Sequence, residues 1–137
     1  MDGYPLTMQQ RVVWRDLDAL GHVNNAVYAT YLETARGEYL SALPGCDIDF
    51  KSLILAELTI TYRSPAFVRE TLQVGVRVAE IRNSSFILES QIEEKGSGRL
   101  VGTARAVVVH YDYTANRAKP VPKEWREAIS RLEGREL

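Results

Sequence analysis

The segment from Asn25 to Leu43 is too apolar for an exposed helix, and this excess constrains the fold most. Aromatic and aliphatic side chains recur at the spacing of one helical face, at positions 28, 31, 32, 35 and 39. Apolar residues at 27, 29, 40 and 43 widen that face beyond a single stripe. Asn24 or Asn25 can cap the start of this helix, and Pro44-Gly45 is expected to end it. Other elements must therefore wrap it.

Five strand-like segments supply that wrapping. Before the helix, residues 7–15 alternate between apolar and polar side chains, as a half-buried strand does. After the helix, four further runs lie between residues 53 and 112, separated by short turns. We expect the last run to let a helix approach closely, because it contains the small residues Gly102, Ala104 and Ala106. Consecutive strands with short connections predict an antiparallel sheet.

The chain ends in a second, shorter helix. Pro120-Val121-Pro122 precedes it, and Gly134 is expected to end it. Its apolar side consists of Trp125, Ala128, Ile129 and Leu132. With 45% hydrophobic and 26% charged residues in 137, the composition is globular and disfavours disorder. We therefore predict a single α+β domain over residues 1–137, a curved antiparallel sheet wrapped around one long central helix.

Charged and polar residues gather directly before the central helix. Two carboxylates, a glycine turn, an imidazole and two amides lie between Arg15 and Asn25. The first N–H groups of a helix have no partner within it, and the macrodipole adds about half a positive charge there. Such a helix end favours anions, including an oxyanion that forms only during a reaction.

This run resembles the signature of hotdog-fold acyl-CoA thioesterases, the group that contains 4-hydroxybenzoyl-CoA thioesterase. Their hallmark is an Asp-x-Asp-x-x-Gly turn leading into a long central helix, and the predicted order of elements is that of the hotdog fold. Three further stretches look like the family, and they follow in the family's order. They are Tyr28-x-x-Tyr31-Leu32-Glu33-x-x-Arg36, Ile60-x-Tyr62-Arg63-Ser64-Pro65-Ala66 and the Pro-x-Pro before the last helix.

The resemblance implies site residues in the turn and the first helical turn. Asp18 matches the catalytic carboxylate, and the backbone N–H of Asn25 matches the group that polarises the thioester carbonyl. His22 and Asn24 are then expected to contact substrate. His22, Asn24 and Asn25 replace aliphatic or aromatic residues of the 4-hydroxybenzoyl-CoA enzyme, a departure that concerns the aromatic substrate rather than the thioesterase chemistry.

A second implied site concerns the nucleotide end of coenzyme A (CoA). The segment from Glu80 to Phe86 resembles the turn at which the family contacts it. We expect the substrate-binding residues of this turn to be Arg82, Asn83, Ser84 and Ser85. Arginine can bond phosphate oxygens, and the serines offer hydroxyl or backbone donors. The alternative is a polar turn that only joins two strands.

Each candidate also has a structural interpretation. Aspartates in turns often accept backbone N–H groups, and we assign that role to Asp16. Asp18 could activate water or attack the thioester directly. His22 could be a base, a substrate contact or a loop residue. Glu33 lies about 12 Å further along the helix than Asn25, and it is the reserve carboxylate, because a second hotdog lineage uses this helix. His110 is expected to be structural.

The leading function is hydrolysis of an acyl-CoA thioester to free acid and CoA. The alternatives are a thioesterase acting on acyl-carrier protein and a non-catalytic acyl-CoA-binding hotdog protein. The expected partner is another copy of the chain, giving a homodimer or a homotetramer built from dimers, because hotdog sheets leave an unpaired edge strand. We expect no cofactor apart from the CoA of the substrate, and no metal.

Charge and hydropathy argue against nucleic-acid-binding, membrane-spanning and secreted proteins. A net charge of −1 gives no general reason to bind nucleic acid or an anionic membrane. No run approaches the ~18 apolar residues of a membrane span, and the N-terminus does not resemble a secretory signal. Cys46 is the only cysteine and cannot form a disulfide within the chain. We therefore expect a cytoplasmic protein.

Overall fold

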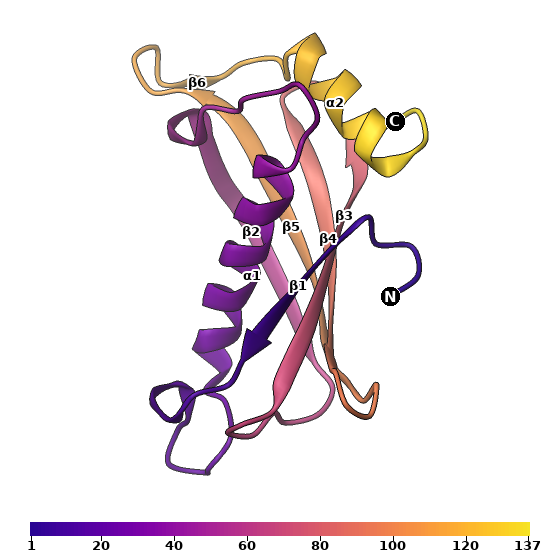
Figure 1. Ribbon diagram of the computed structural model, residues 1–137. Coiled ribbons are helices and arrows are strands. Elements are labelled where there is room, and N and C mark those ends of the chain that lie inside the picture. The colour runs from indigo at the N-terminus through magenta and orange to yellow at the C-terminus, as the bar shows by residue number, and fades with distance from the viewer.

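The computed structural model describes residues 1–137 as one curved antiparallel sheet with two helices (Figure 1). The central helix α1 spans Asn25–Ser41, and the terminal helix α2 spans Lys123–Glu133. The strands are β1 (Leu6–Arg11), β2 (Leu53–Tyr62), β3 (Thr71–Ile81), β4 (Ser85–Glu94), β5 (Leu100–Asp112) and β6 (Arg117–Ala118). Single-turn helices η1 and η2 span Trp14–Asp16 and Phe50–Ser52. The predicted fold class, an antiparallel sheet curved around one long helix, is confirmed.

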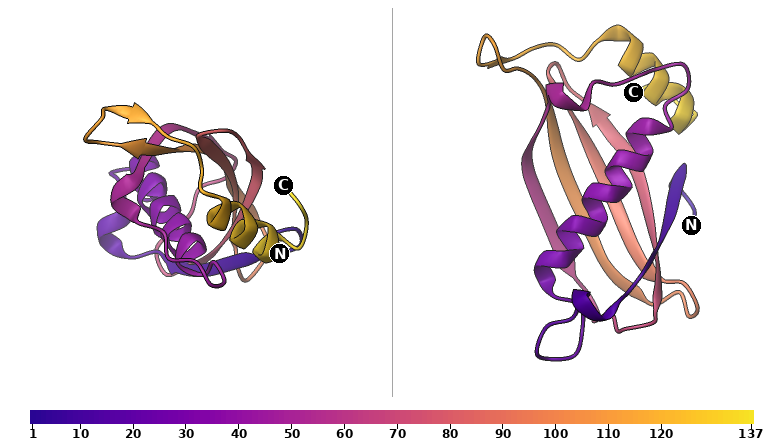
Figure 2. Two further views of the ribbon diagram at one scale, coloured as in Figure 1. Left: turned by 90° about the horizontal axis from the view of Figure 1, so that it is seen from above. Right: turned by 60° about the vertical axis from the view of Figure 1, so that its left-hand side comes forward.

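The strands follow the order β1-β3-β4-β5-β2, and β6 pairs with β5. The edges are therefore β1, with six residues, and β2, with ten. The view from above shows the sheet curling around α1 (Figure 2). The helix α2 lies over the end of the sheet where β3 turns into β4 (Figure 1). Neither helix has the length and apolarity that crossing a membrane requires.

The apolar face of α1 forms much of the core, as its periodicity predicts. Tyr39 is fully buried, and Leu32 is 1% exposed. Burying a side chain of this size typically contributes about 1.5–3 kcal/mol. The helix lies closest to β1 and β3. The expectation that small residues would bring a helix close to β5 is therefore wrong. Gly102 instead allows a close strand pairing, because a Cβ there would lie 2.9 Å from the carbonyl oxygen of Thr61.

The first strand is shorter than the alternation predicts. It ends at Arg11 instead of reaching residue 15. Val12 still forms backbone hydrogen bonds with residues 69 and 70, but the chain then turns into η1. The carboxylate of Asp16 accepts the N–H of Val13 at 3.1 Å and stabilises this turn. As a result, Trp14 is largely exposed, although the alternation places it on the buried face.

The end of α2 covers part of an unpaired strand edge. β1 pairs with β3 only as far as Val76. Beyond that point, Glu133 accepts the N–H of Val78 at 2.8 Å, and Arg135 donates to the carbonyl oxygen of Val78 at 3.4 Å. Glu133 also accepts the hydroxyl of the buried Tyr39. One carboxylate thus joins α2 to both the sheet and α1.

Candidate active site

The predicted site segment folds into a tight turn that precedes α1. The N–H of Asp18 donates to the carbonyl oxygen of His22 at 3.0 Å, and the N–H of Gly21 donates back to Asp18 at 3.1 Å. Leu17 and Val23 close the turn as an antiparallel bridge. Gly21 has a φ of +86°, a conformation that side chains rarely adopt. The backbone conformation of this turn therefore explains why the motif has a glycine at position 21.

Asp16 organises this turn, as predicted. Its carboxylate accepts the hydroxyl of Tyr31 at 2.7 Å in addition to the N–H of Val13. Its carbonyl oxygen accepts the N–H of Asn24 at 2.9 Å. Burial first, and then the hydrogen bond with Asp16, raise the pKa of Tyr31 above its ordinary value. Asp16 thus connects the start of the turn to the second turn of α1.

The first N–H groups of α1 are not all satisfied. The side chain of Asn24 caps the helix by accepting the N–H of Ala26 at 2.9 Å, and its carbonyl oxygen accepts the N–H of Val27 at 2.9 Å. The N–H of Asn25 has no acceptor in the chain. This free donor lies at the positive end of a helix of 17 residues. It is therefore available to a ligand oxygen.

A cavity of about 230 Å³ lies at this helix end. Its lining residues come from the turn, from α1 and from the segment that ends β2. They are His22, Val23, Asn25, Tyr28, Tyr62, Arg63, Ser64 and Pro65. Apolar walls with a few convergent polar groups are typical of small-molecule sites.

Asp18 lies behind His22 rather than in the cavity wall. One carboxylate oxygen accepts the N–H of Leu20 at 2.8 Å, and the other lies 3.7 Å from Nδ1 of His22. Nδ1 of His22 also lies 3.3 Å from the carbonyl oxygen of Val23. The side chains of Asp18 and His22 are 25% and 30% exposed, so water reaches both of them. The structure therefore places His22 and Asn25 in the cavity wall and Asp18 against His22.

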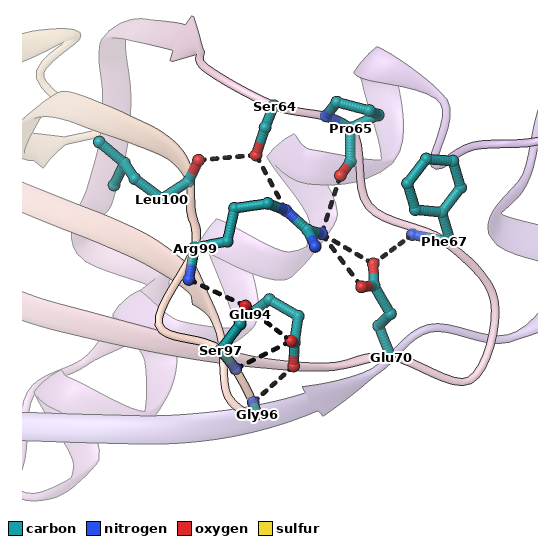
Figure 3. Close-up of polar contacts among 9 residues, drawn as sticks. All are labelled: Ser64, Pro65, Phe67, Glu70, Glu94, Gly96, Ser97, Arg99 and Leu100. Carbon is teal, nitrogen blue, oxygen red and sulfur yellow. Dashed lines mark hydrogen bonds and ion pairs between the residues drawn. The ribbon is translucent and has the colours of Figure 1, made fainter.

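An arginine from the β4–β5 connection holds the opposite wall (Figure 3). Arg99 donates from Nε to the Ser64 hydroxyl at 3.2 Å and from Nη2 to the Pro65 carbonyl oxygen at 3.0 Å. The same guanidinium pairs with both oxygens of Glu70, and Glu70 accepts the N–H of Phe67 at 2.7 Å. The loop after β2 is thus fixed by its own carboxylate and a distant arginine.

This loop also contacts the turn that carries Asp18. The carbonyl oxygen of Ala66 accepts the N–H of Val23 at 2.9 Å. The Tyr62 hydroxyl donates to the carbonyl oxygen of Asn25 at 3.0 Å. The sequence pattern singled out the stretch from Ile60 to Ala66 as family-like but assigned a role only to Arg63, which with Arg105 was a candidate to assist Arg82 in binding CoA. The contribution of Arg99 carries no local signal, because its partners are about 30 residues away in the chain.

The candidate CoA turn lies at the other end of the molecule. Asn25 begins α1 at the lower end in Figure 1, whereas the β3–β4 turn lies at the upper end, beside α2. A helix of 17 residues spans about 25 Å, so the two sites are far apart within one chain. Arg82 pairs with Glu80 at 3.3 Å there, and Asn83 donates to the Ser84 hydroxyl at 3.2 Å. The structure does not bring this turn to the cavity of the same chain.

The remaining candidates lie outside the cavity. Glu33 is exposed on α1. His110 is buried, with Nδ1 2.8 Å from the carbonyl oxygen of Pro120 and its ring 4.4 Å from that of Trp125, so its predicted structural role is confirmed. No three histidine, cysteine, aspartate or glutamate side chains gather as a metal-binding group would require.

Comparison with known proteins decides the family. The family model described as the thioesterase-like superfamily matches residues 12–129. The chain belongs to this superfamily. Its membership confirms the predicted family and the predicted enzyme class, a thioester hydrolase.

Individual members of the family are similar along most of the chain. A Thermus thermophilus thioesterase, solved in complex with coenzyme A and Zn, has a TM-score of 0.90 and 33% identity, covering 100% of both chains. Long-chain acyl-CoA thioesterase FadM of Escherichia coli is 27% identical over 85% of this chain and 90% of its own. Acyl-acyl carrier protein thioesterase ATL3 of Arabidopsis thaliana is 29% identical over 77% of this chain and 56% of its own.

Proposed function

We propose that this protein hydrolyses the thioester of an acyl-CoA to a free acid and CoA. The observation that carries the proposal is the free N–H of Asn25, a residue that begins α1 and lines the cavity. Thioester hydrolysis moves negative charge onto the carbonyl oxygen. A fixed donor at a positive helix end stabilises that charge without reorganising.

Asp18 supplies the base or the nucleophile in this proposal. As a base, it takes a proton from water while the water oxygen attacks the carbonyl carbon. The tetrahedral intermediate then collapses, the C–S bond breaks, and the CoA thiolate leaves and takes up a proton. As a nucleophile, Asp18 attacks the carbonyl carbon, the C–S bond breaks, the CoA thiolate leaves and takes up a proton, and an acyl anhydride forms. Water then hydrolyses the anhydride to the free acid and restores the Asp18 carboxylate.

The position of His22 supports a variant of the first route. His22 faces the cavity, and Asp18 lies behind it at 3.7 Å from Nδ1. In this variant the imidazole takes the proton of water, and the carboxylate orients the ring and stabilises its charged form. Both routes require Asp18.

The names of similar proteins support CoA as the group carried by the substrate. FadM is named a long-chain acyl-CoA thioesterase, and the Thermus structure contains coenzyme A. ATL3 is named an acyl-acyl carrier protein thioesterase, which keeps a carrier protein as the second candidate. An acidic carrier favours a basic surface, and the net charge of −1 gives this chain no overall excess of positive charge.

A second chain completes the site in this proposal. The outer edge of β2 is unpaired, and its exposed residues include Leu55 and Tyr62. Antiparallel pairing of two β2 edges would invert the second chain. Its β3–β4 turn would then lie at the same end as Asn25 of the first chain, where Arg82, Asn83, Ser84 and Ser85 could contact the nucleotide end of CoA.

Purified protein tests the function directly. Acyl-CoAs and acyl-carrier proteins bearing the same acyl groups are supplied in parallel, and the released thiol is measured with a thiol reagent. We expect turnover of acyl-CoA that Asp18→Asn abolishes. Binding of acyl-CoA with no thiol release would instead identify a non-catalytic binding protein. Turnover of carrier-protein substrates alone would identify the second candidate.

Arg82 and the oligomeric state have separate tests. Arg82→Ala is expected to raise KM for acyl-CoA and to leave hydrolysis of a short thioester without CoA unchanged. Equal losses on both substrates would assign Arg82 to folding. Light scattering is expected to show a dimer or a tetramer, and a fully active monomer would contradict a shared site.

A further inference from the structure

Tyr62 joins the end of β2 to the first residue of α1. Its hydroxyl donates to the carbonyl oxygen of Asn25 at 3.0 Å, and its ring lines the cavity. Asn25 is also the residue whose N–H is free. Tyr62 is 45% exposed, so it is not a core residue that the fold requires to be buried.

A second tyrosine closes the cavity behind Tyr62. The rings of Tyr28 and Tyr62 lie 5.5 Å apart, inclined at 59°. Tyr28 is 3% exposed, and Leu32, one helical turn further along α1, is 1% exposed. Side chains therefore fill the space along α1 beyond the two rings. A group that enters beside Asn25 meets this aromatic pair.

The cavity is small for a substrate site. Its volume of about 230 Å³ lies below the ~300 Å³ at which pockets for small molecules usually begin. In the proposed complex CoA extends outward from this cavity, and the acyl group is the part of the substrate that enters it. A butanoyl group or a single ring is compact enough for this space, whereas an extended dodecanoyl chain reaches beyond it.

We infer that Tyr62 determines acyl-chain specificity and restricts the enzyme to acyl groups that end at the Tyr28–Tyr62 pair. The inference rests on the proposed acyl-CoA substrate. It also separates this chain from FadM, whose name specifies long-chain acyl groups. The Tyr62 ring sets the length limit, and its hydroxyl holds the peptide of Asn25.

Two substitutions distinguish the role of the Tyr62 ring from that of its hydroxyl. Tyr62→Phe keeps the ring and removes the hydrogen bond to Asn25. Tyr62→Ala removes both and opens the space beside Tyr28. Tyr113→Ala is the matched control, because Tyr113 is 54% exposed and its hydroxyl donates to the carbonyl oxygen of Leu53 at 3.1 Å. Tyr113 follows β5, far from the cavity.

Calorimetry with two thioethers that cannot be hydrolysed, S-butyl-CoA and S-dodecyl-CoA, measures the limit on acyl-chain length. The wild-type protein and Tyr62→Phe are expected to bind the dodecyl ligand no more tightly than the butyl ligand. Tyr62→Ala should shift that preference toward the dodecyl ligand by at least ~10-fold, roughly the effect of burying two further methylenes. Tyr113→Ala should leave it unchanged.

The corresponding thioesters give a kinetic readout. For Tyr62→Ala, kcat/KM for dodecanoyl-CoA should rise relative to that for butanoyl-CoA. For Tyr62→Phe, kcat should fall equally on both substrates. A wild-type preference for the dodecyl ligand, or an unchanged preference in Tyr62→Ala, would overturn the inference. Thioethers that bind as expected while the thioesters stay intact would instead refute only the proposed hydrolysis.

Discussion

The guanidinium of Arg99 donates to both carboxylate oxygens of Glu70, at 2.9 and 3.1 Å, and so joins the β4–β5 connection to the loop after β2. The same guanidinium holds Ser64 and Pro65, two residues of the cavity wall (Figure 3). The pair is partly exposed, so its direct contribution to stability is modest. Its main effect is on the position of the loop.

Arg99→Lys is expected to lower kcat/KM more than it lowers stability. Lysine keeps the charge but lacks the planar fork that reaches Ser64, Pro65 and Glu70 together. We expect a loss of about 1–2 kcal/mol in the free energy of unfolding and a site that becomes sensitive to salt, because a weakened ion pair near the surface is screened. Urea unfolding and kinetics at two ionic strengths measure both. Lys123→Ala is the control, since its pair with Glu127 lies on α2.

Tyr31→Phe tests the connection between Asp16 and α1. The substitution removes the hydrogen bond of 2.7 Å and leaves Asp16 with the N–H of Val13. The turn that carries Asp18 should then move relative to the helix end. Because small misplacements of reacting groups are costly, we expect kcat to fall by roughly 10-fold or more with KM little changed. A variant with unchanged kcat and only a lower melting temperature would show that the bond serves folding alone.

Three substitutions rank the candidate carboxylates and the imidazole. Asp18→Asn should lower kcat by at least ~100-fold with folding preserved. His22→Ala should have a similar effect if the imidazole takes the proton, and a small one if Asp18 acts directly. Glu33→Gln should leave kcat unchanged, because Glu33 is exposed on α1 away from the cavity. An active Asp18→Asn together with an inactive Glu33→Gln would reverse the assignment.

Glu133→Ala should destabilise the fold without touching the active site. It leaves the N–H of Val78 and the hydroxyl of the buried Tyr39 without their acceptor. Each unsatisfied buried group costs about 1–3 kcal/mol, so we expect a total of about 2–6 kcal/mol for the two groups. Chemical unfolding gives this value, and Glu136→Ala at the chain end is the control. At a temperature where both proteins are folded, kcat should equal that of the wild-type protein.

Alkaline pH tests the same contact through Tyr39. Burial first, and then its hydrogen bond with Glu133, raise the pKa of the Tyr39 hydroxyl above its ordinary value of 10.0. The unfolded chain therefore loses this proton at lower pH than the folded chain. The stabilisation is fully present below about pH 10 and is lost as pH rises toward the folded pKa. The free energy of unfolding should fall more steeply above pH 10 in the wild-type protein than in Tyr39→Phe.

The sequence predicts most of the fold because its periodicities are local. The helical spacing from Tyr28 to Tyr39 and the four strand runs after residue 53 correspond to α1 and to β2–β5. Alternation failed near Trp14, where the side chain of Asp16 turns the chain before the pattern ends. The two-residue strand β6 is too short to leave a periodic signal.

The candidate site likewise has a part that local sequence predicts and a part that it does not. Asp18, His22 and Asn25 lie within eight residues, and the short turn that leads into α1 places them near one another. The opposite wall and its support from Arg99 depend on tertiary contacts between segments about 30 residues apart. No local pattern records such contacts. The roles of Tyr62 and Arg99 are therefore visible only in the folded chain.

The contact between Glu133 and Val78 also bears on how many copies of the chain can associate. It occupies the outer edge of β3 where β1 no longer covers it, and β1 itself is short and follows Pro5. The ten-residue edge of β2 is the long edge left open. A subunit with one long open edge can be joined once through it, by a twofold axis, and the joined pair has only the short β1 edges left. We therefore expect association of chains through sheet edges to stop at the dimer. Loss of the Glu133 contact would expose the β3 edge, and dimers could then add to one another into an extended sheet.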